Sequence, residues 1–183
     1  MARLTILHPD SAGAVSAVLS LEITYARFEH GWVYYDIYPA FGGQPILNGA
    51  ALKTSQNWGP ARPGALLACE DEFCSLLPAM RRFIETGEPG EWTPTEPDVT
   101  LTMAPGEGSA TSLNLVLEID TYQWRRVTAY CGPMVSITYD CTQAAFRQFY
   151  QDLRVEFLTF RDANDIVGYN IANGFDRPEH EWF

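Results

Sequence analysis

The chain is poor in lysine and rich in acid. Lys53 is the only lysine among twelve Lys and Arg residues, which face 23 acidic residues and leave a formal net charge of −11. Such a charge repels nucleic acid and acidic membrane surfaces and attracts basic proteins, although acidity also serves solubility. The composition therefore predicts neither a nucleic-acid partner nor a membrane partner.

Familiar catalytic and metal-binding motifs are missing as well. The sequence has no G-x-S-x-G, no His-Glu-x-x-His and no calcium loop, and Gly106-x-Gly108 lacks the helix and lysine of a phosphate-binding loop. Two pairs of carboxylates could do acid–base work, Glu118 with Asp120 and Glu96 with Asp98, but such pairs more often form a solvated face. We therefore expect no metal and no cofactor.

Cysteine and histidine are scarce. Cys131 is the best candidate for a nucleophilic thiol, although a small buried side chain is its ordinary interpretation. The candidate bases, His8, His30 and His180, all fall in expected turns or in the C-terminal tail. Without a base placed beside a nucleophile, we expect no catalytic residue and no enzymatic activity.

The four cysteines match no zinc-binding spacing, and a chain of 183 residues does not need disulfides to fold. We therefore expect four free thiols in a reducing compartment. No apolar run is long enough to span a membrane, and the first residues lack the clustered basic start of a signal peptide. These absences predict a cytoplasmic protein.

What the chain does contain is alternating apolar and polar runs. These predict strands over residues 3–7, 15–28, 32–38, 98–103, 113–120, 127–130 and 135–139, with a further strand within 46–52. The second strand is long enough to carry a bulge. The third has aromatic residues on both faces, which is typical of a central strand covered on both sides, and Pro39 is expected to end it.

Two segments have helical periodicity. Residues 66–86 predict a helix with Glu70, Asp71 and Glu72 in its first turn and Gly87 after its end. Pro78 should kink this helix or mark a fresh start at Leu77.

A second, aromatic-rich helix begins after residue 140, with Asp140 as N-cap and Gln143 completing a capping box. Its buried positions fall at helical spacing: Ala145, Phe146, Phe149, Tyr150, Leu153 and Phe157. Residues 155–160 form either its end or a short strand.

The order of strands, helix, strands and helix predicts an α+β fold: a mainly antiparallel twisted sheet packed by two amphipathic helices. Residues 1–160 are expected to form a single domain, and residues 161–183 a C-terminal tail that packs on it or extends from it. The Gly- and Pro-rich segment 40–63 reads as an exposed loop, for which a variable decoration is the preferred interpretation over a functional role.

Four segments carry a family resemblance. They are the helix 70–86, the linker Trp-Thr-Pro-Thr-Glu-Pro-Asp-Val-Thr-Leu at 92–101, the strand Leu117-Glu118-Ile119 leading to Trp124, and the closing strand and helix from Val135. Over residues 70–157 the chain resembles the WapI-type immunity proteins of bacterial contact-dependent toxin systems. The resemblance implies a small cytosolic protein that neutralises a cognate toxin domain by binding it.

Two hypotheses follow. The first is a non-enzymatic immunity protein that holds a basic toxin domain on an acidic surface at the first helix and the loop after it. Its expected contacts are Glu70, Asp71, Glu72, Glu88, Glu91, Trp92 and Glu96. The second is a small-ligand-binding protein or an enzyme whose pocket is lined by four aromatic residues of one strand, Trp32, Tyr34, Tyr35 and Tyr38, which otherwise form a plain aromatic core.

Overall fold

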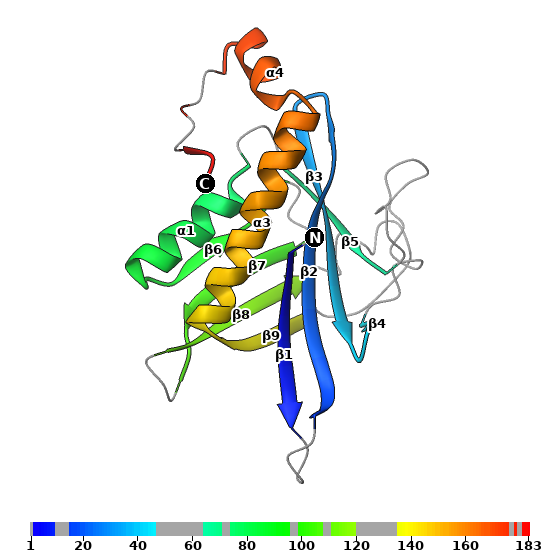
Figure 1. The fold of residues 1–183 in the computed structure, drawn as a ribbon, viewed down its shortest axis with the longest axis vertical. Coiled ribbons are helices and arrows are strands. Elements are labelled where there is room, and N and C mark those ends of the chain that lie inside the picture. Colours follow the sequence, from blue (N-terminus) through cyan, green and yellow to red (C-terminus); the bar gives the residue numbers. More distant parts are fainter. Residues whose placement is uncertain are drawn as a thin grey trace.

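The computed structural model describes residues 2–9, 15–46, 64–70, 74–95, 99–107, 111–119, 135–175, 178 and 181–183. Within these residues the chain forms nine strands, arranged in two antiparallel sheets, and three helices (Figure 1). The α+β class is therefore confirmed. The expected strand at 127–130 and most of the one at 46–52 lie outside the described residues.

The first sheet is built from the N-terminal part of the chain. It contains β1 (Ala2–Pro9), β2 (Val15–Glu29), β3 (Trp32–Phe41), β4 (Gln44–Pro45) and β5 (Leu66–Glu70). The long β2 carries the expected bulge, between Tyr25 and Arg27. His30 (φ 53°) and Gly31 (φ 86°) both adopt the left-handed backbone that a tight hairpin turn requires. The central strand is β3, because β2 pairs along one edge and β5 and β4 along the other.

Pro39 does not end β3, contrary to expectation. It pairs with Leu21 of β2, and its carbonyl accepts from the Ile46 amide at 3.0 Å, on the opposite side. Because the N–H and C=O of one residue point to the same side of an antiparallel strand, the proline nitrogen also faces away from β2. β5 stops at Leu66, opposite Ile37, so proline removes no hydrogen bond to β5 at this position.

The second sheet comes from the middle of the chain, in the order β6 (Gly90–Trp92), β7 (Val99–Pro105), β8 (Ser112–Ile119) and β9 (Val135–Thr142). The alternation expected for β8 is confirmed, since its four apolar residues are buried: Leu113, Leu115, Leu117 and Ile119. β6 was not expected. Its three residues pair with β7 and bring Trp92 opposite Leu101.

The first helix, α1, spans Leu76–Thr86 and is shorter than expected. Residues 66–70 form β5 instead, because pairing with β3 outweighs their helical periodicity. Pro78 therefore lies in the first turn, where the amides have no partner within the helix and its missing N–H costs little. Gly87 (φ 68°) ends the helix, and its N–H donates to the Phe83 carbonyl, as predicted.

The second expected helix, α3, spans Gln143–Ala163, so residues 155–160 are helical. Five of its six expected core positions are confirmed as buried, namely Phe146, Phe149, Tyr150, Leu153 and Phe157, and Ala145 is half-buried. The predicted cap is wrong. Asp140 still belongs to β9, and the hydroxyl of Thr142 accepts from the Ala145 amide at 3.1 Å.

The chain continues beyond α3 as α4 (Ile166–Ala172) and then returns to the core. Trp182 is buried and stacks on Phe157, with ring centroids 5.8 Å apart. Arg81 of α1 donates to the carbonyl of Phe183, and the Arg154 guanidinium lies over the Phe183 ring. The segment after residue 160 therefore packs on the domain, and the expected boundary at 160 falls inside α3.

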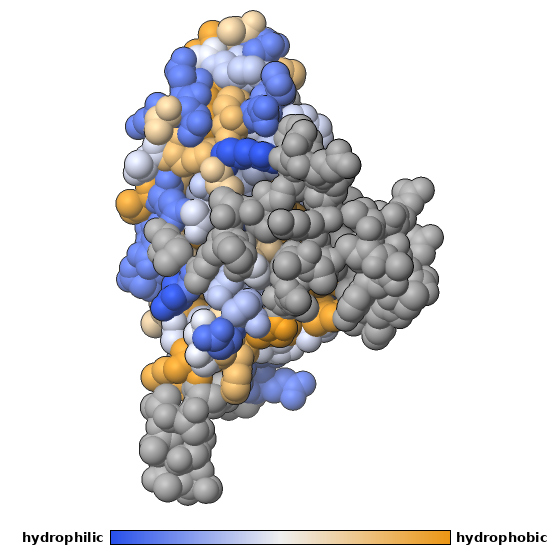
Figure 2. All heavy atoms as spheres, turned by 90° about the vertical axis from the view of Figure 1, so that its right-hand side faces the viewer, coloured by the Kyte–Doolittle hydropathy of each residue, from blue (hydrophilic) through white to orange (hydrophobic). Residues whose placement is uncertain are grey.

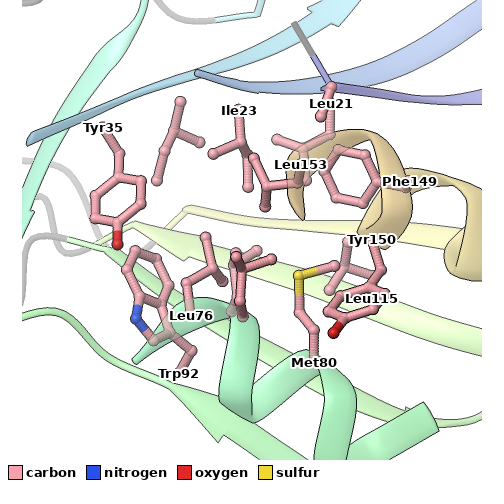
Figure 3. Close-up of a cluster of buried hydrophobic side chains, with 14 of the residues drawn as sticks. Leu21, Ile23, Tyr35, Leu76, Met80, Trp92, Leu115, Phe149, Tyr150 and Leu153 are labelled. Carbon is pink, nitrogen blue, oxygen red and sulfur yellow. The ribbon is translucent and has the colours of Figure 1, made fainter. Parts of the chain in front are cut away.

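The two sheets and two helices enclose one main core. α3 packs against β1, β2 and α1, while α1 also packs against β6 and β7 (Figure 1). In Figure 3, Leu21 and Ile23 of β2 face Leu153 and Phe149 of α3, and Met80 of α1 lies beside Tyr150. This arrangement leaves the C-terminal end of α1 beside the first turn of α3.

Candidate functional site

Glu70, expected on the surface, is buried. It ends β5 with 2% of its surface exposed and accepts hydrogen bonds from Tyr35 Oη, Ser75 Oγ (2.7 Å) and Trp92 Nε1 (3.2 Å). The Ser75 backbone N–H also donates to this carboxylate. Glu70 thus meets the N-terminus of α1 from a neighbouring strand, where a negative charge is favourable.

Burial changes the pKa values of the two titratable groups in this hydrogen-bond network, Glu70 and Tyr35. Desolvation raises the pKa of the Glu70 carboxyl above its ordinary value of 4.5, although the donors from Tyr35, Ser75 and Trp92 oppose this shift. Desolvation, followed by the nearby Glu70 charge, likewise holds the pKa of Tyr35 well above 10.0. Because each Glu70 oxygen has donors and the group lies away from solvent, its role is to join β3, β5, α1 and β6.

Trp92, expected as an anchor for a partner, belongs to the protein's own core. It is 2% exposed, and its ring meets the Tyr35 ring edge-on, with centroids 5.5 Å apart. Figure 3 shows the two side chains pointing toward one another from opposite sheets. Neither Glu70 nor Trp92 is therefore available as a surface contact in this fold.

Two of the expected contacts are exposed. Glu88 and Glu91 lie just after α1, on the approach to and within β6. Glu88 is paired with Arg82 at 3.7 Å, and Glu91 accepts from the Thr93 hydroxyl at 3.0 Å. The other three expected contacts, Asp71, Glu72 and Glu96, lie outside the described residues. The exposed carboxylates that the structure describes are thus at the C-terminal end of α1. The sequence had predicted three further acidic contacts, Glu70, Asp71 and Glu72, at the start of this helix.

A cavity of about 300 Å³ with apolar and polar walls opens next to this end of α1. Four apolar side chains form much of its wall: Phe83 and Ile84 of α1, Leu113 of β8 and Phe146 of α3. Polar side chains also line it, namely Ser112, Gln143 and Arg147. Arg147 Nη2 donates to the Ile84 carbonyl at 3.3 Å, which ties the first turn of α3 to the end of α1. We call this the apolar cavity after its four apolar side chains, to distinguish it from the neighbouring cavity.

A second cavity of about 280 Å³ lies on the β6 side of the same helix end. It is lined by Ala79, Arg82, Phe83, Glu88, Pro89, Gly90 and Glu91. We call it the acidic cavity, because the carboxylates of Glu88 and Glu91 and a single guanidinium, that of Arg82, line it. Phe83 lines both cavities, so the two are direct neighbours.

Sequence reasoning missed the apolar cavity. Phe146 was expected only as a core side chain, and nothing local indicates that the end of one helix meets the start of another. The available signals were two glycines, Gly87 after the end of α1 and Gly106 after β7. Neither places a side chain on the rim of the cavity.

The four aromatic residues of β3 do not share one face. Tyr35 points into the main core, whereas Tyr34 and Tyr38 point to the other face of the sheet, beside the buried carboxylates of Asp36 and Glu22. Figure 2 views the molecule from the side of β3 and β5, where hydrophobic residues gather near the upper end among hydrophilic ones. None of these four aromatic residues is among the described residues that line the two cavities at the end of α1.

The remaining candidates for chemistry are not brought together within the described residues. His30 is exposed beside Glu29, and Glu118 lies on β8, while Cys131, Asp98 and Asp120 fall outside. Cys69, Cys74 and Cys141 are buried and form no disulfide with one another, and desolvation with the charge of Asp140 raises the pKa of Cys141 to about 12. In the same part of the chain, no group of three or more His, Cys, Asp or Glu side chains could hold a metal ion.

No protein-family model matches the chain, and no curated protein matches it. Among the helices that the structure describes, none combines the length and the apolar character needed to cross a membrane.

Proposed function

We propose that this protein is a non-enzymatic inhibitor of the immunity type, which binds and neutralises a cognate, basic bacterial toxin domain in the cytoplasm. The observation that carries the proposal is the position of two exposed carboxylates next to a second cavity that has apolar and polar side chains in its wall. Glu88 and Glu91 line the acidic cavity, and the apolar cavity begins on the other side of Phe83.

This arrangement fits the usual anatomy of a protein interface. An apolar centre supplies binding free energy, whereas charged residues around it fix orientation and speed encounter. The net charge of −11 attracts a basic partner at long range, whichever part of the surface it binds. The resemblance of residues 70–157 to WapI-type immunity proteins supports the same kind of partner.

Binding without turnover also agrees with the chemistry found in the described residues. Glu70, a buried carboxylate with a raised pKa, accepts hydrogen bonds from Tyr35, Ser75 and Trp92 and is not among the described residues that line either cavity. Among the described residues that line the apolar cavity there is no carboxylate, histidine or thiol. Its polar groups suit recognition of a side chain better than general acid–base catalysis.

Co-expression with a candidate toxin domain, sought in the genes next to this one, tests the proposal. The wild-type protein should restore growth of cells that produce the toxin domain, and the purified proteins should form a complex. Reversing Glu88 and Glu91 to Arg should weaken protection, whereas the matched reversal of Asp152 and Asp162, exposed on α3, should not. If the wild-type protein neither protects cells nor binds the domain, the immunity proposal is wrong.

A further inference from the structure

The two cavities at the end of α1 share a wall. Phe83 lines both, and Gly87 of the apolar cavity is followed directly in the chain by Glu88 of the acidic cavity. Two groups that occupy the cavities at the same time must therefore be close to one another. This proximity restricts what kind of partner segment could fill both.

The apolar cavity suits a single ring. At about 300 Å³ it lies at the small end of ligand pockets, which range over roughly 300–1,000 Å³. Phe83 meets the fully buried Phe146 edge-on, with centroids 5.7 Å apart, and Phe83 keeps 6% of its surface exposed, where a third ring can make contact. The exposed Arg147 guanidinium on the rim can lie over the face of an inserted ring.

Polar groups on the rim favour an aromatic side chain that also has a polar atom. The Ser112 hydroxyl at the edge of the apolar wall donates to the Glu107 carbonyl at 3.4 Å, and a hydroxyl that donates can also accept a hydrogen bond. A tryptophan N–H or tyrosine hydroxyl could bond there while its ring is buried, which an aliphatic side chain cannot do. Tryptophan and tyrosine are also common as dominant contacts in protein interfaces.

The acidic cavity suits a cation. Glu88 and Glu91 outnumber Arg82, and the ion pair between Arg82 and Glu88 joins side chains that are 78% and 67% exposed. An ion pair this exposed contributes little, so a partner cation can replace Arg82 at small cost. Glu91 faces the same space with a neutral hydroxyl, that of Thr93, as neighbour.

We infer that the partner is recognised through a segment in which an aromatic residue, tryptophan or tyrosine, lies close to an arginine or lysine. The ring enters the apolar cavity between α1 and α3, and the cation enters the acidic cavity beside Glu88 and Glu91. This inference rests on the proposed function, because it specifies the chemistry of the partner at the same site.

Blocked synthetic peptides test the inference without a toxin. The probes are acetylated, amidated peptides with Trp and Arg adjacent or separated by one or two glycines. Matched peptides carry Ala in place of Trp or Gln in place of Arg. Titration of the full-length protein, followed by NMR signals of Ile84, Gly87, Gly106 and Leu113, should show binding in the millimolar range for at least one spacing.

The Ala peptide should lose this binding, and the Gln peptide should bind about two- to fivefold more weakly, as expected for an exposed ion pair. Substituting Ile84→Trp should fill the apolar cavity and abolish binding that depends on the ring. Gln143→Trp, at the exposed mouth, gives a second variant of the same kind, and Val167→Trp on α4 is the control. Glu88→Gln with Glu91→Gln should erase the difference between the Arg and Gln peptides.

The inference fails if no peptide perturbs these signals at about 10 mM, or if the Ala and Trp peptides bind equally. It also fails if wild-type protein, Ile84→Trp and Gln143→Trp all protect cells equally from the toxin domain, in which case the proposed function stands. If the peptides bind as expected but the wild-type protein does not neutralise the toxin domain, the cavities stand and the proposed function falls.

Discussion

The indole N–H of Trp92, in the second sheet, donates to the carboxylate of Glu70, in the first, with Nε1 and Oε2 3.2 Å apart. The same carboxylate accepts from Tyr35 and from Ser75 at the start of α1. One buried acid therefore links both sheets to the helix whose far end forms the candidate binding surface. Changes at Glu70 should be read as changes in stability rather than in partner contact.

Substituting Glu70→Ala should lower the free energy of unfolding by about 2–4 kcal/mol, because Tyr35 and Trp92 would keep buried donors without an acceptor. Urea denaturation measures this loss. The exposed Glu88→Ala is the control and should change stability by less than about 0.5 kcal/mol. Equal effects of the two substitutions would contradict the assignment of Glu70 to a buried network.

Glu70 should also make stability depend on pH in a defined direction. A carboxyl whose pKa is raised by folding binds its proton more tightly in the native state, so its contribution is full below 4.5 and is lost as the pH rises through the raised pKa. The stability of the wild-type protein relative to Glu70→Gln should therefore fall as the pH rises from about 4 to about 8. If urea denaturation shows that the difference in unfolding free energy between the wild-type protein and Glu70→Gln stays constant or rises with pH, desolvation does not outweigh the hydrogen bonds to Glu70.

The start of α3 provides a test of local structure. Thr142→Ala should cost about 0.5–2 kcal/mol, because the Ala145 amide loses its side-chain acceptor. Asp140→Ala, two residues earlier and exposed in β9, should cost less than about 0.5 kcal/mol. Denaturation of both variants compares the two caps directly, and a larger loss at Asp140 would restore the cap predicted from the sequence.

The core face of α3 gives the largest expected effect. Phe149 is 1% exposed, and Phe149→Ala should destabilise the protein by about 3–5 kcal/mol. The neighbouring Gln148→Ala, on the exposed face, is the matched control. A loss below about 1 kcal/mol for Phe149→Ala would show that α3 is oriented differently.

These elements also show what the sequence could predict. The periodicity of β8 and α3 is strong and local, so their buried residues were assigned correctly. Residues 66–70 were misassigned because their helical pattern is overridden by pairing with β3, from which they are separated by about thirty residues. Thr142 was missed because Asp140 and Gln143 have the spacing of a capping box, and the extent of β9 decides between the two caps.

The candidate surface was predicted only in part. Glu88 and Glu91 are exposed as expected, because they follow a helix end marked by Gly87. Glu70 and Trp92 looked like surface residues from charge and from the proline-rich linker, but a tertiary contact between two sheets buries both. The apolar cavity depends on the meeting of α1 and α3, which no local pattern encodes.

The most direct test of the proposed function is the association rate of the purified protein with the candidate toxin domain, measured as a function of salt. Association should slow as salt rises, because screening acts over about 8–10 Å, and Glu88→Arg with Glu91→Arg should slow it further. The matched reversal of Asp152 and Asp162 should have a smaller effect. The absence of any complex with the wild-type protein at low salt would contradict the immunity proposal.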